Sequence, residues 1–395
     1  MRSKMVLLAI VCAAAWPCAA AEVAIAQDGM TLVDGERRFV IGMYEHPKDN
    51  AVLEAVADAG VNIVRARSKE QLDRLDAHGI YAWVNTGYRI NLGPEGEEPA
   101  DDLRALVEAH ANHPALLVWE VPDEALWGCW LKAWREGGSL VERYARYEAR
   151  RDAMAAGIRH GYETLKTLDP HHPVWMNHAP CNSFEDLALF GRAADIMGCD
   201  IYPVCQPPGI PWDITKLRLG AVGEFTELND RAAPGKPTWT VLQGFGWGDL
   251  GKGPMVFSVE GSRRPTAHEL RCMTFDAIIR GARGVLFWGT HYLEKDTRLW
   301  RDVLDVCREL HELQPVLAAP DYAGAVASEA RFLLWQFDTA VNALGKQTED
   351  GVWWLVVNET PLPLRYTLTA GAYRIARSIE PHGVHIIPPE PRGTY

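Results

Sequence analysis

"HPALLVWEVPDEAL", residues 113–126, is an apolar run that ends on two adjacent acids, Asp123 and Glu124. The run is short and continuous, which predicts a buried strand with its functional groups at the carboxyl end. A second stretch, "TWTVLQGFGWG" at residues 238–248, has the same form but carries Gln243 and no acid. One strand therefore ends in a doubled carboxylate, and its counterpart ends in an amide.

Strands and amphipathic helices alternate on both sides of these stretches. The strands are predicted at 39–43, 61–67, 80–88, 115–124, 173–180, 195–204, 237–247 and 283–292. Each is followed by a helical pattern, including a long helix at 140–168 and a last one at 297–313. Eight such units predict a (β/α)₈ TIM barrel in the α/β class. A doubly wound open sheet is the alternative, but no G-x-G-x-x-G or P-loop follows the first strand.

The two ends of the chain differ from this pattern. Residues 1–21 combine Arg2 and Lys4 with an apolar core and small residues, which predicts a secretory signal peptide cut after Ala21 and a secreted or periplasmic protein. The alternative, a membrane anchor, needs about 20 apolar residues. After Pro320 short strand-like runs predict a small all-β, sandwich-like domain. The expected domains are a barrel at 22–318, opened by a β-hairpin, and a β domain at 319–395.

The composition restricts the class of partner. The chain has a formal net charge of -12, which argues against nucleic acid and against an anionic membrane surface. A highly sulfated or otherwise polyanionic substrate is less expected, although the sequence allows a local basic pocket. Fifteen tryptophans suit contacts with the apolar faces of sugar rings. No membrane insertion is expected, and the oligomeric state stays open.

Six cysteines follow the predicted signal, and none forms the close pair typical of a zinc site. Cys129, Cys181 and Cys205 fall in predicted loops and are the best candidates for one disulfide. Cys272 and Cys307 lie in helical patterns and are expected to be buried free thiols. No metal or cofactor is predicted.

In a barrel the active site lies at the carboxyl ends of the strands. The ends offer Tyr44, Glu45, His46, Arg65, Arg67, Asn85, Tyr88, Asp123, Glu124, Asn177, His178, Asp200, Tyr202, Gln243, Trp247, Trp288, His291 and Tyr292. The set contains no histidine pair at helical metal-binding spacing and no G-x-S-x-G turn. Carboxylates and aromatic rings without a metal suit the cleavage of a glycosidic bond.

The phrases "DGERRFVIGMY", "HPALLVWEVPDE" and "GARGVLFWG" resemble the large clan of (β/α)₈ retaining glycoside hydrolases, over about residues 29–315. The resemblance implies that Glu124 is the general acid/base and that Asp123 replaces the usual asparagine. The clan places its nucleophilic glutamate where this chain has Gln243. A neutral amide cannot form the glycosyl ester of the ordinary retaining mechanism.

A second resemblance accounts for both departures. Hexosaminidases that work by substrate assistance carry adjacent Asp-Glu at this strand end and need no protein nucleophile, because the 2-acetamido group of the sugar attacks its own anomeric carbon. The resemblance implies that Asp123 orients that group while Glu124 protonates the leaving oxygen and then activates water. Tyr202 is the candidate donor to the acetamido oxygen. The other candidate substrate contacts are Trp83, Trp247, Trp288, Asp200, Glu45, Asn85, Gln243 and His178.

The sequence thus predicts a secreted, exo-acting β-N-acetylhexosaminidase that releases terminal GalNAc or GlcNAc with retention. One alternative is a β-galactosidase-like or inverting glycosidase that pairs Glu124 with Glu45, Asp200 or Glu224. Another is a carbohydrate-binding barrel without catalysis. Glu120 is interpreted as a buried structural acid whose partner is Arg65 or Arg67.

Overall fold

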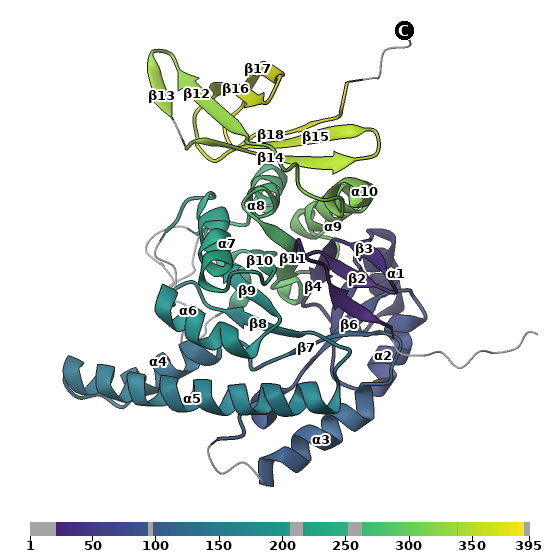
Figure 1. Ribbon diagram of the computed structural model, residues 1–395, viewed down its shortest axis with the longest axis vertical. Coiled ribbons are helices and arrows are strands. Elements are labelled where there is room, and N and C mark those ends of the chain that lie inside the picture. Colours follow the sequence, from purple (N-terminus) through teal and green to yellow (C-terminus); the bar gives the residue numbers. More distant parts are fainter. Residues whose placement is uncertain (1–20, 94–97, 206–215, 252–262, 338, 391–395) are drawn as a thin grey trace, which may run out of the picture.

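The computed structural model describes residues 21–93, 98–205, 216–251, 263–337 and 339–390 (Figure 1). Eight parallel strands form a closed barrel in which the last strand pairs with the first. In order they are β4 (Val40–Met43), β5 (Ile63–Ala66), β6 (Tyr81–Asn85), β7 (Leu116–Glu120), β8 (Val174–His178), β9 (Ile196–Ile201), β10 (Thr238–Gln243) and β11 (Ala282–Trp288). The predicted (β/α)₈ barrel is confirmed. The predicted signal peptide lies outside the described residues, apart from Ala21, and stays a prediction.

The helices pack around the barrel. They are α1 (Asn50–Asp58), α2 (Lys69–Asp76), α3 (Glu98–His110), α4 (Ala125–Arg135), α5 (Leu140–Leu168), α6 (Phe184–Phe190), α7 (Ala221–Ala232), α8 (Ala267–Ile279), α9 (Arg298–Glu312) and α10 (Gln314–Leu317). Short 3₁₀ helices are η1 (Gly87–Ile90), η2 (Gly191–Ala193), η3 (Trp247–Leu250) and η4 (Thr290–Tyr292). Helix α5 has the predicted bounds and begins with a capping box between Ser139 and Glu142. None of the described helices is long and apolar enough to cross a membrane.

Helix α4 was not expected from the sequence. It begins directly after Glu124, and its rings of Trp127, Trp130 and Trp134 stack at centroid distances of 4.8 Å. Cys129 is therefore buried in a helix and not in a loop, and both it and Cys205 carry free thiols. The disulfide expected among Cys129, Cys181 and Cys205 is not formed. The expectation for Cys272 and Cys307, buried free thiols, is confirmed.

Indole rings fill the barrel interior. Trp83, Trp175 and Trp239 are fully buried, and Tyr44 lies against the first two with ring centroids 5.0 and 6.0 Å away. A Cβ at Gly198 would stand 2.5 Å from Nε1 of Trp175, so only glycine leaves room for that ring. Because the lower barrel is packed solid, the polar residues beyond it at the strand ends form the floor of any site.

Two antiparallel sheets flank the barrel in sequence. The first, at the N-terminus, is β1 (Val23–Ile25), β2 (Thr31–Val33) and β3 (Glu36–Arg38). It contains the predicted hairpin turn, since Val33 pairs with Glu36.

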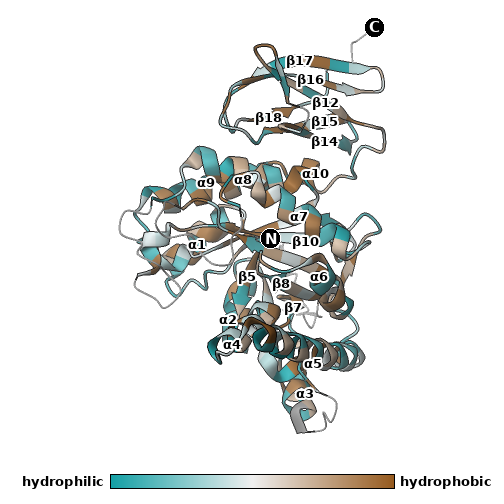
Figure 2. Ribbon diagram, turned by 90° about the vertical axis from the view of Figure 1, so that its left-hand side faces the viewer, coloured by the Kyte–Doolittle hydropathy of each residue, from teal (hydrophilic) through white to brown (hydrophobic). Residues whose placement is uncertain are grey.

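The C-terminal domain is a two-sheet sandwich over α8, α9 and α10 (Figures 1 and 2). One sheet has the order β13-β12-β16-β17 and the other β14-β15-β18. Their bounds are β12 (Ala327–Phe332), β13 (Trp335–Phe337), β14 (Val341–Thr348), β15 (Gly351–Asn358), β16 (Leu364–Ala370), β17 (Tyr373–Ile379) and β18 (Val384–Ile387). The predicted C-terminal β domain is confirmed. Residues 330–337, "ARFLLWQF", form a hairpin, because Leu333 takes a left-handed conformation with φ 54° and turns the chain.

Candidate active site

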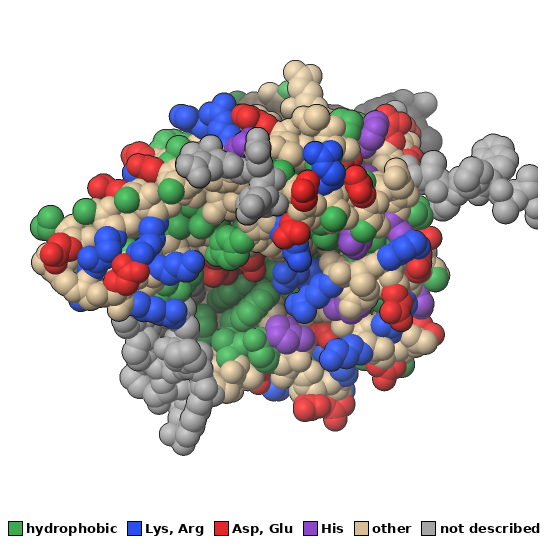
Figure 3. All heavy atoms as spheres, turned by 90° about the horizontal axis from the view of Figure 1, so that it is seen from below, with side chains coloured by type: hydrophobic (Ala, Val, Ile, Leu, Met, Phe, Trp, Pro, Cys, Tyr) green, Lys and Arg blue, Asp and Glu red, His purple; other side chains and the backbone are tan. Residues whose placement is uncertain are grey.

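The carboxyl ends of the eight strands direct one ring of side chains inward. Asn85 and Asn177 each lie two residues beyond an inward-facing tryptophan of the same strand, so they point the same way. The ring comprises Tyr44, Arg65, Asn85, Glu120, Asn177, Asp200, Gln243 and Trp288. The face seen from below in Figure 3 is hollowed at its centre, with hydrophobic side chains inside and acidic ones along its edge.

Glu120 ends β7 and is fully buried. Its Oε2 accepts hydrogen bonds from Nε1 of Trp83 at 3.1 Å and Nδ2 of Asn85 at 2.5 Å, and Oε1 lies 3.4 Å from the Tyr44 hydroxyl. Of the two predicted partners, Arg65 is the one in contact, with its Nε 3.9 Å from Oε2. Burial, followed by the charge of Asp123, raises the pKa of Glu120 to about 8. Glu120 is therefore a neutral acid near pH 7.

Asp123 follows three residues later, and part of its surface is exposed at the strand end. Its Oδ1 accepts a hydrogen bond from Nδ2 of Asn177 at 3.0 Å, whereas Oδ2 has no hydrogen-bond partner within the described part of the chain. The surrounding protein removes solvation and raises the pKa of Asp123, although Asn177 and Arg65 act in the opposite direction. One carboxylate oxygen is thus held and the other is available to a ligand.

Glu124 is half-buried and has a left-handed backbone, with φ 49° and ψ 38°. Its N–H donates to the Asn177 carbonyl at 3.3 Å, and its own carbonyl accepts the first helical hydrogen bond of α4 from Gly128. A non-glycine residue in this region costs about 1 kcal/mol or more, and such strain gathers at functional sites. The turn carries Asp123 and Glu124 off the strand axis at the mouth of the barrel.

Two buried tyrosines lie among these acids, and Asp123 and Asp200 act on both of them. Burial and then the neighbouring carboxyl groups of Asp123, Glu120 and Asp200 raise the pKa of Tyr44. Burial, Asp200, Tyr44 and then Glu124 raise the pKa of Tyr202. Both phenols therefore keep their protons and can donate hydrogen bonds.

Aromatic rings form one wall of the site. Tyr202 stacks on Trp288 with centroids 5.3 Å apart and an interplanar angle of 20°. Trp247 meets Tyr202 at 6.3 Å, and Phe245 packs edge-on against Trp288 at 5.0 Å. Trp288 is only partly buried, so this stack offers a flat apolar surface at the end of β11. Such surfaces suit the C–H faces of sugars.

Gln243 is fully buried and makes three hydrogen bonds to the backbone. Its Oε1 accepts from the Val204 N–H at 2.9 Å, and its Nε2 donates to the carbonyls of Val204 and Phe245 at 2.9 and 3.1 Å. These bonds join the segments that carry Tyr202 and Trp247. The amide at this strand end fixes the aromatic wall.

Three of the predicted site residues lie apart from the acid pair. His178 points out of the barrel against Phe190 of α6, and burial lowers its pKa to about 4. Trp83 lies below the site under Glu120. Glu45 is buried and paired with Lys295 Nζ at 2.9 Å. The described residues contain no cluster of His, Cys, Asp or Glu that could hold a metal ion.

Asn177 is the contact that sequence reasoning underrated. It lies beside His178 at the end of β8, and the sequence does not show which of the two faces inward. Side chains along a strand alternate between its two faces, and the ring of Trp175 faces the barrel interior. Asn177, two residues later, therefore also faces inward.

Replacing Glu120 with glutamine is expected to remove a pH dependence of stability. The wild-type carboxyl keeps its proton in the folded protein up to a pKa of about 8, whereas its ordinary value is 4.5. Between these values the unfolded chain binds fewer protons, so the free energy of unfolding falls as pH rises, by on the order of 4 kcal/mol. Glu120→Gln is expected to lack this decline.

Urea unfolding from about pH 5 to about pH 8 measures the free energy of unfolding at each pH, with the exposed Glu54→Gln as control. Parallel curves for wild type and Glu120→Gln would contradict the assignment.

No family model matches the sequence, and no curated protein sequence matches it. Solved structures do share its architecture. A catalytic mutant of a GH42 β-galactosidase from G. stearothermophilus aligns 98% of its chain with 89% of this one, at a TM-score of 0.56 and 10% identity. A structure described as a glycoside hydrolase covers 93% of both chains, at 0.54 and 13% identity.

The cold-active β-galactosidase from Rahnella sp. R3 matches 73% of this chain at a TM-score of 0.53 and 15% identity. This chain spans 58% of the Rahnella protein, less than two thirds of its length. At these identities the likeness is one of fold. The chain has the barrel architecture of these glycoside hydrolases.

Proposed function

We propose that the protein is a glycoside hydrolase that releases a terminal β-linked N-acetylhexosamine by a retaining, substrate-assisted mechanism. The observation that carries the proposal is the adjacent acids Asp123 and Glu124 beyond the end of β7, combined with a buried Gln243 where the ordinary mechanism would need a nucleophile. No Asp or Glu occurs between Lys236 and Gly248. The fold shared with known glycosidases supports the general class.

The first step forms a ring within the sugar. The carbonyl oxygen of the 2-acetamido group attacks the anomeric carbon while Glu124 donates its proton to the leaving oxygen, and the glycosidic bond breaks. The amide N–H of the resulting oxazolinium faces the open oxygen of Asp123, whose charge offsets the developing positive charge. Tyr202, kept protonated by its buried acidic surroundings, is the candidate donor to the acetamido oxygen.

The second step opens the ring. Glu124, now ionised, takes a proton from water, whose oxygen attacks the anomeric carbon from the side the aglycone left. Two inversions give net retention, and the acetamido group is restored. Asn177 serves this cycle indirectly, because its side chain holds one oxygen of Asp123 and its carbonyl holds the Glu124 backbone.

Wild-type protein is expected to hydrolyse aryl β-GalNAc or β-GlcNAc at least about a hundredfold faster than β-Gal and β-Glc, because only the acetamido sugars bring their own nucleophile. Parallel kcat/KM measurements on the four substrates test this. Similar values on all four would reject substrate assistance.

A second candidate is a β-galactosidase-like enzyme without the acetamido requirement. Asp200 favours it as the second carboxylate, since its charge acts on Tyr202 together with the charges of Asp123 and Glu124. Glu224 and Glu45 suit that role less well, because Glu224 is paired with Lys216 and Arg218, and Glu45 with Lys295. Preference for plain hexosides, abolished by Asp200→Asn, would support this candidate.

A further inference from the structure

The outer face of the sheet β13-β12-β16-β17 gathers three arginines. Residues directly opposite in an antiparallel sheet point to the same side, and side chains two residues apart along a strand share a face. The register gives three cross-strand rows: Arg331, Arg365 and Ser378; Glu329, Thr367 and Ala376; Ala327, Thr369 and Arg374. The alternate positions, such as Tyr366 and Leu368, are buried in the sandwich.

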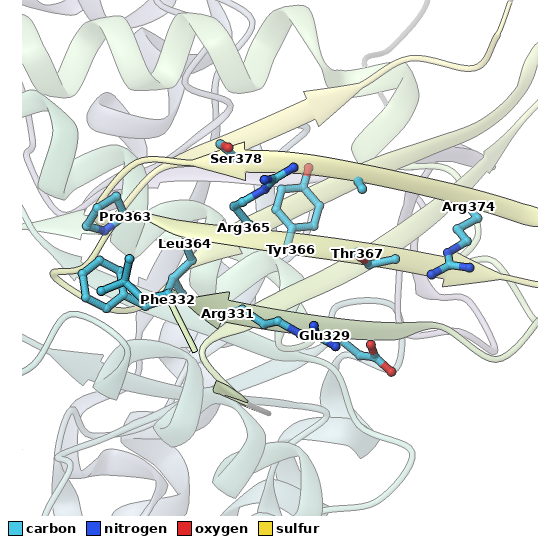
Figure 4. Close-up of a pocket in the computed structure, with 12 residues that line it drawn as sticks. Glu329, Arg331, Phe332, Pro363, Leu364, Arg365, Tyr366, Thr367, Arg374 and Ser378 are labelled. Atoms are coloured by element: carbon cyan, nitrogen blue, oxygen red, sulfur yellow. The ribbon is translucent and has the colours of Figure 1, made fainter. Parts of the chain in front are cut away.

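A shallow hollow of about 730 Å³ lies on this face (Figure 4). Small side chains at Thr367, Ala376 and Ser378 leave its middle open, and the arginines stand on three neighbouring strands around it. The rim at one end is apolar, with Phe332, Leu333 and Pro363. We call this surface, with its three rows and this rim, the arginine face.

The charges of the arginine face are not balanced internally. Within the described part of the chain, the side chains of Arg331, Arg365 and Arg374 make no ion pair, whereas Arg271 of α8 and Arg283 of β11 are both paired with carboxylates. The face holds three positive charges against Glu329 in a chain whose net charge is -12. Mutually repelling guanidinium groups are stabilised by a bound anion.

The spacing of the arginines indicates the kind of anion. Arg331 lies directly opposite Arg365, but Arg374 is displaced by four residues along the strands, or about 13 Å. One small anion cannot reach all three. Hydroxyls on Thr367, Thr369 and Ser378 and the apolar rim add the contacts that sugar rings need. The net charge of -12 opposes any polyanion, and it opposes nucleic acid more than a polysaccharide whose acidic groups are spaced at intervals, because nucleic acid carries a denser charge.

We propose that the arginine face binds an acidic polysaccharide, a chain that bears carboxylate or sulfate groups at intervals. The face belongs to the outer sheet of the sandwich, while β14 and β15 of the other sheet face the barrel helices (Figure 1). A polymer held there leaves the barrel mouth open. The protein would thus be tethered to an anionic matrix, whatever glycoside its barrel cleaves.

The test is binding of the full-length protein to polygalacturonate and to chondroitin sulfate by calorimetry, with neutral dextran beside them. Wild type is expected to bind at least one anionic polymer, more weakly as salt is added. The variant Arg331→Gln/Arg365→Gln/Arg374→Gln is expected to bind roughly tenfold to a hundredfold more weakly. A matched control, Arg104→Gln/Arg298→Gln/Arg301→Gln, removes the same charge from exposed barrel helices and is expected to bind like wild type.

Several results would overturn the proposal. They are equal loss in both triple variants, equal binding of dextran, absence of any binding by wild type, and tighter binding of anionic lipid vesicles or of DNA than of either polysaccharide. Melting curves of the two variants identify any loss that comes from unfolding. Since no readout uses hydrolysis, the result does not depend on the proposed activity.

Discussion

Replacing Glu124 with glutamine is expected to lower kcat/KM on N-acetylhexosaminides with poor leaving groups by about a thousandfold or more. The amide keeps the size and the left-handed turn of Glu124 but has no proton to give to the leaving oxygen and no charge with which to activate water. Steady-state hydrolysis of a methyl glycoside or a chitobiose-type disaccharide measures the loss. The defect should shrink with dinitrophenyl glycosides, because a dinitrophenolate leaves without protonation.

The dependence on leaving group separates chemistry from folding. A misfolded variant has reduced hydrolysis rates on all substrates alike. Loss of the general acid instead lowers the rate more strongly as the leaving oxygen becomes more basic. Glu54→Gln makes the same chemical change on the exposed side of α1 and should leave every rate unaltered. Wild-type rates on the methyl glycoside for Glu124→Gln would reject Glu124 as the acid.

Much of the fold was predictable from the sequence because its signals are local. The helical and strand periods of residues 39–313 repeat eight times, and caps such as Ser139 and Thr297 mark helix starts. The C-terminal strands were predictable for the same reason. The turn at Leu333 was not, because two leucines there offer none of the usual Asn-Gly chemistry of a hairpin.

The strand ends that form the site were predictable from the sequence, but the contacts between their side chains were not. Which side of a strand faces inward depends on how the barrel closes and on which large rings fill it, so Asn177 and His178 were indistinguishable in sequence. The role of Gln243 could not be seen either, since its partner Val204 is distant along the chain. The sequence indicates that Glu120 is a buried structural acid, and its burial in the folded protein raises its pKa to about 8.

Asp123→Asn is expected to lower kcat/KM on acetamido sugars by about a hundredfold to ten-thousandfold, while rates on plain hexosides hardly change. In the proposed mechanism Asp123 acts only where an oxazolinium must be oriented and its charge offset. The asparagine can still bond to Asn177 but carries no negative charge toward the sugar. The measured quantity is the ratio of kcat/KM for β-GalNAc or β-GlcNAc over the matching plain hexoside, in wild type and variant.

Two further measurements test whether this effect comes from the charge of Asp123. Because desolvation raises the pKa of Asp123, the wild-type rate on acetamido sugars should fall on the acid side at a pH above the ordinary 3.8, and the residual activity of Asp123→Asn should lack that limb. Asn177→Ala, which frees the held oxygen without removing the charge, should reduce the same ratio less and keep the limb. If Asp123→Asn instead lowers acetamido and plain substrates equally, the carboxylate serves binding or folding, and the oxazolinium mechanism gives way to a two-carboxylate one with Asp200.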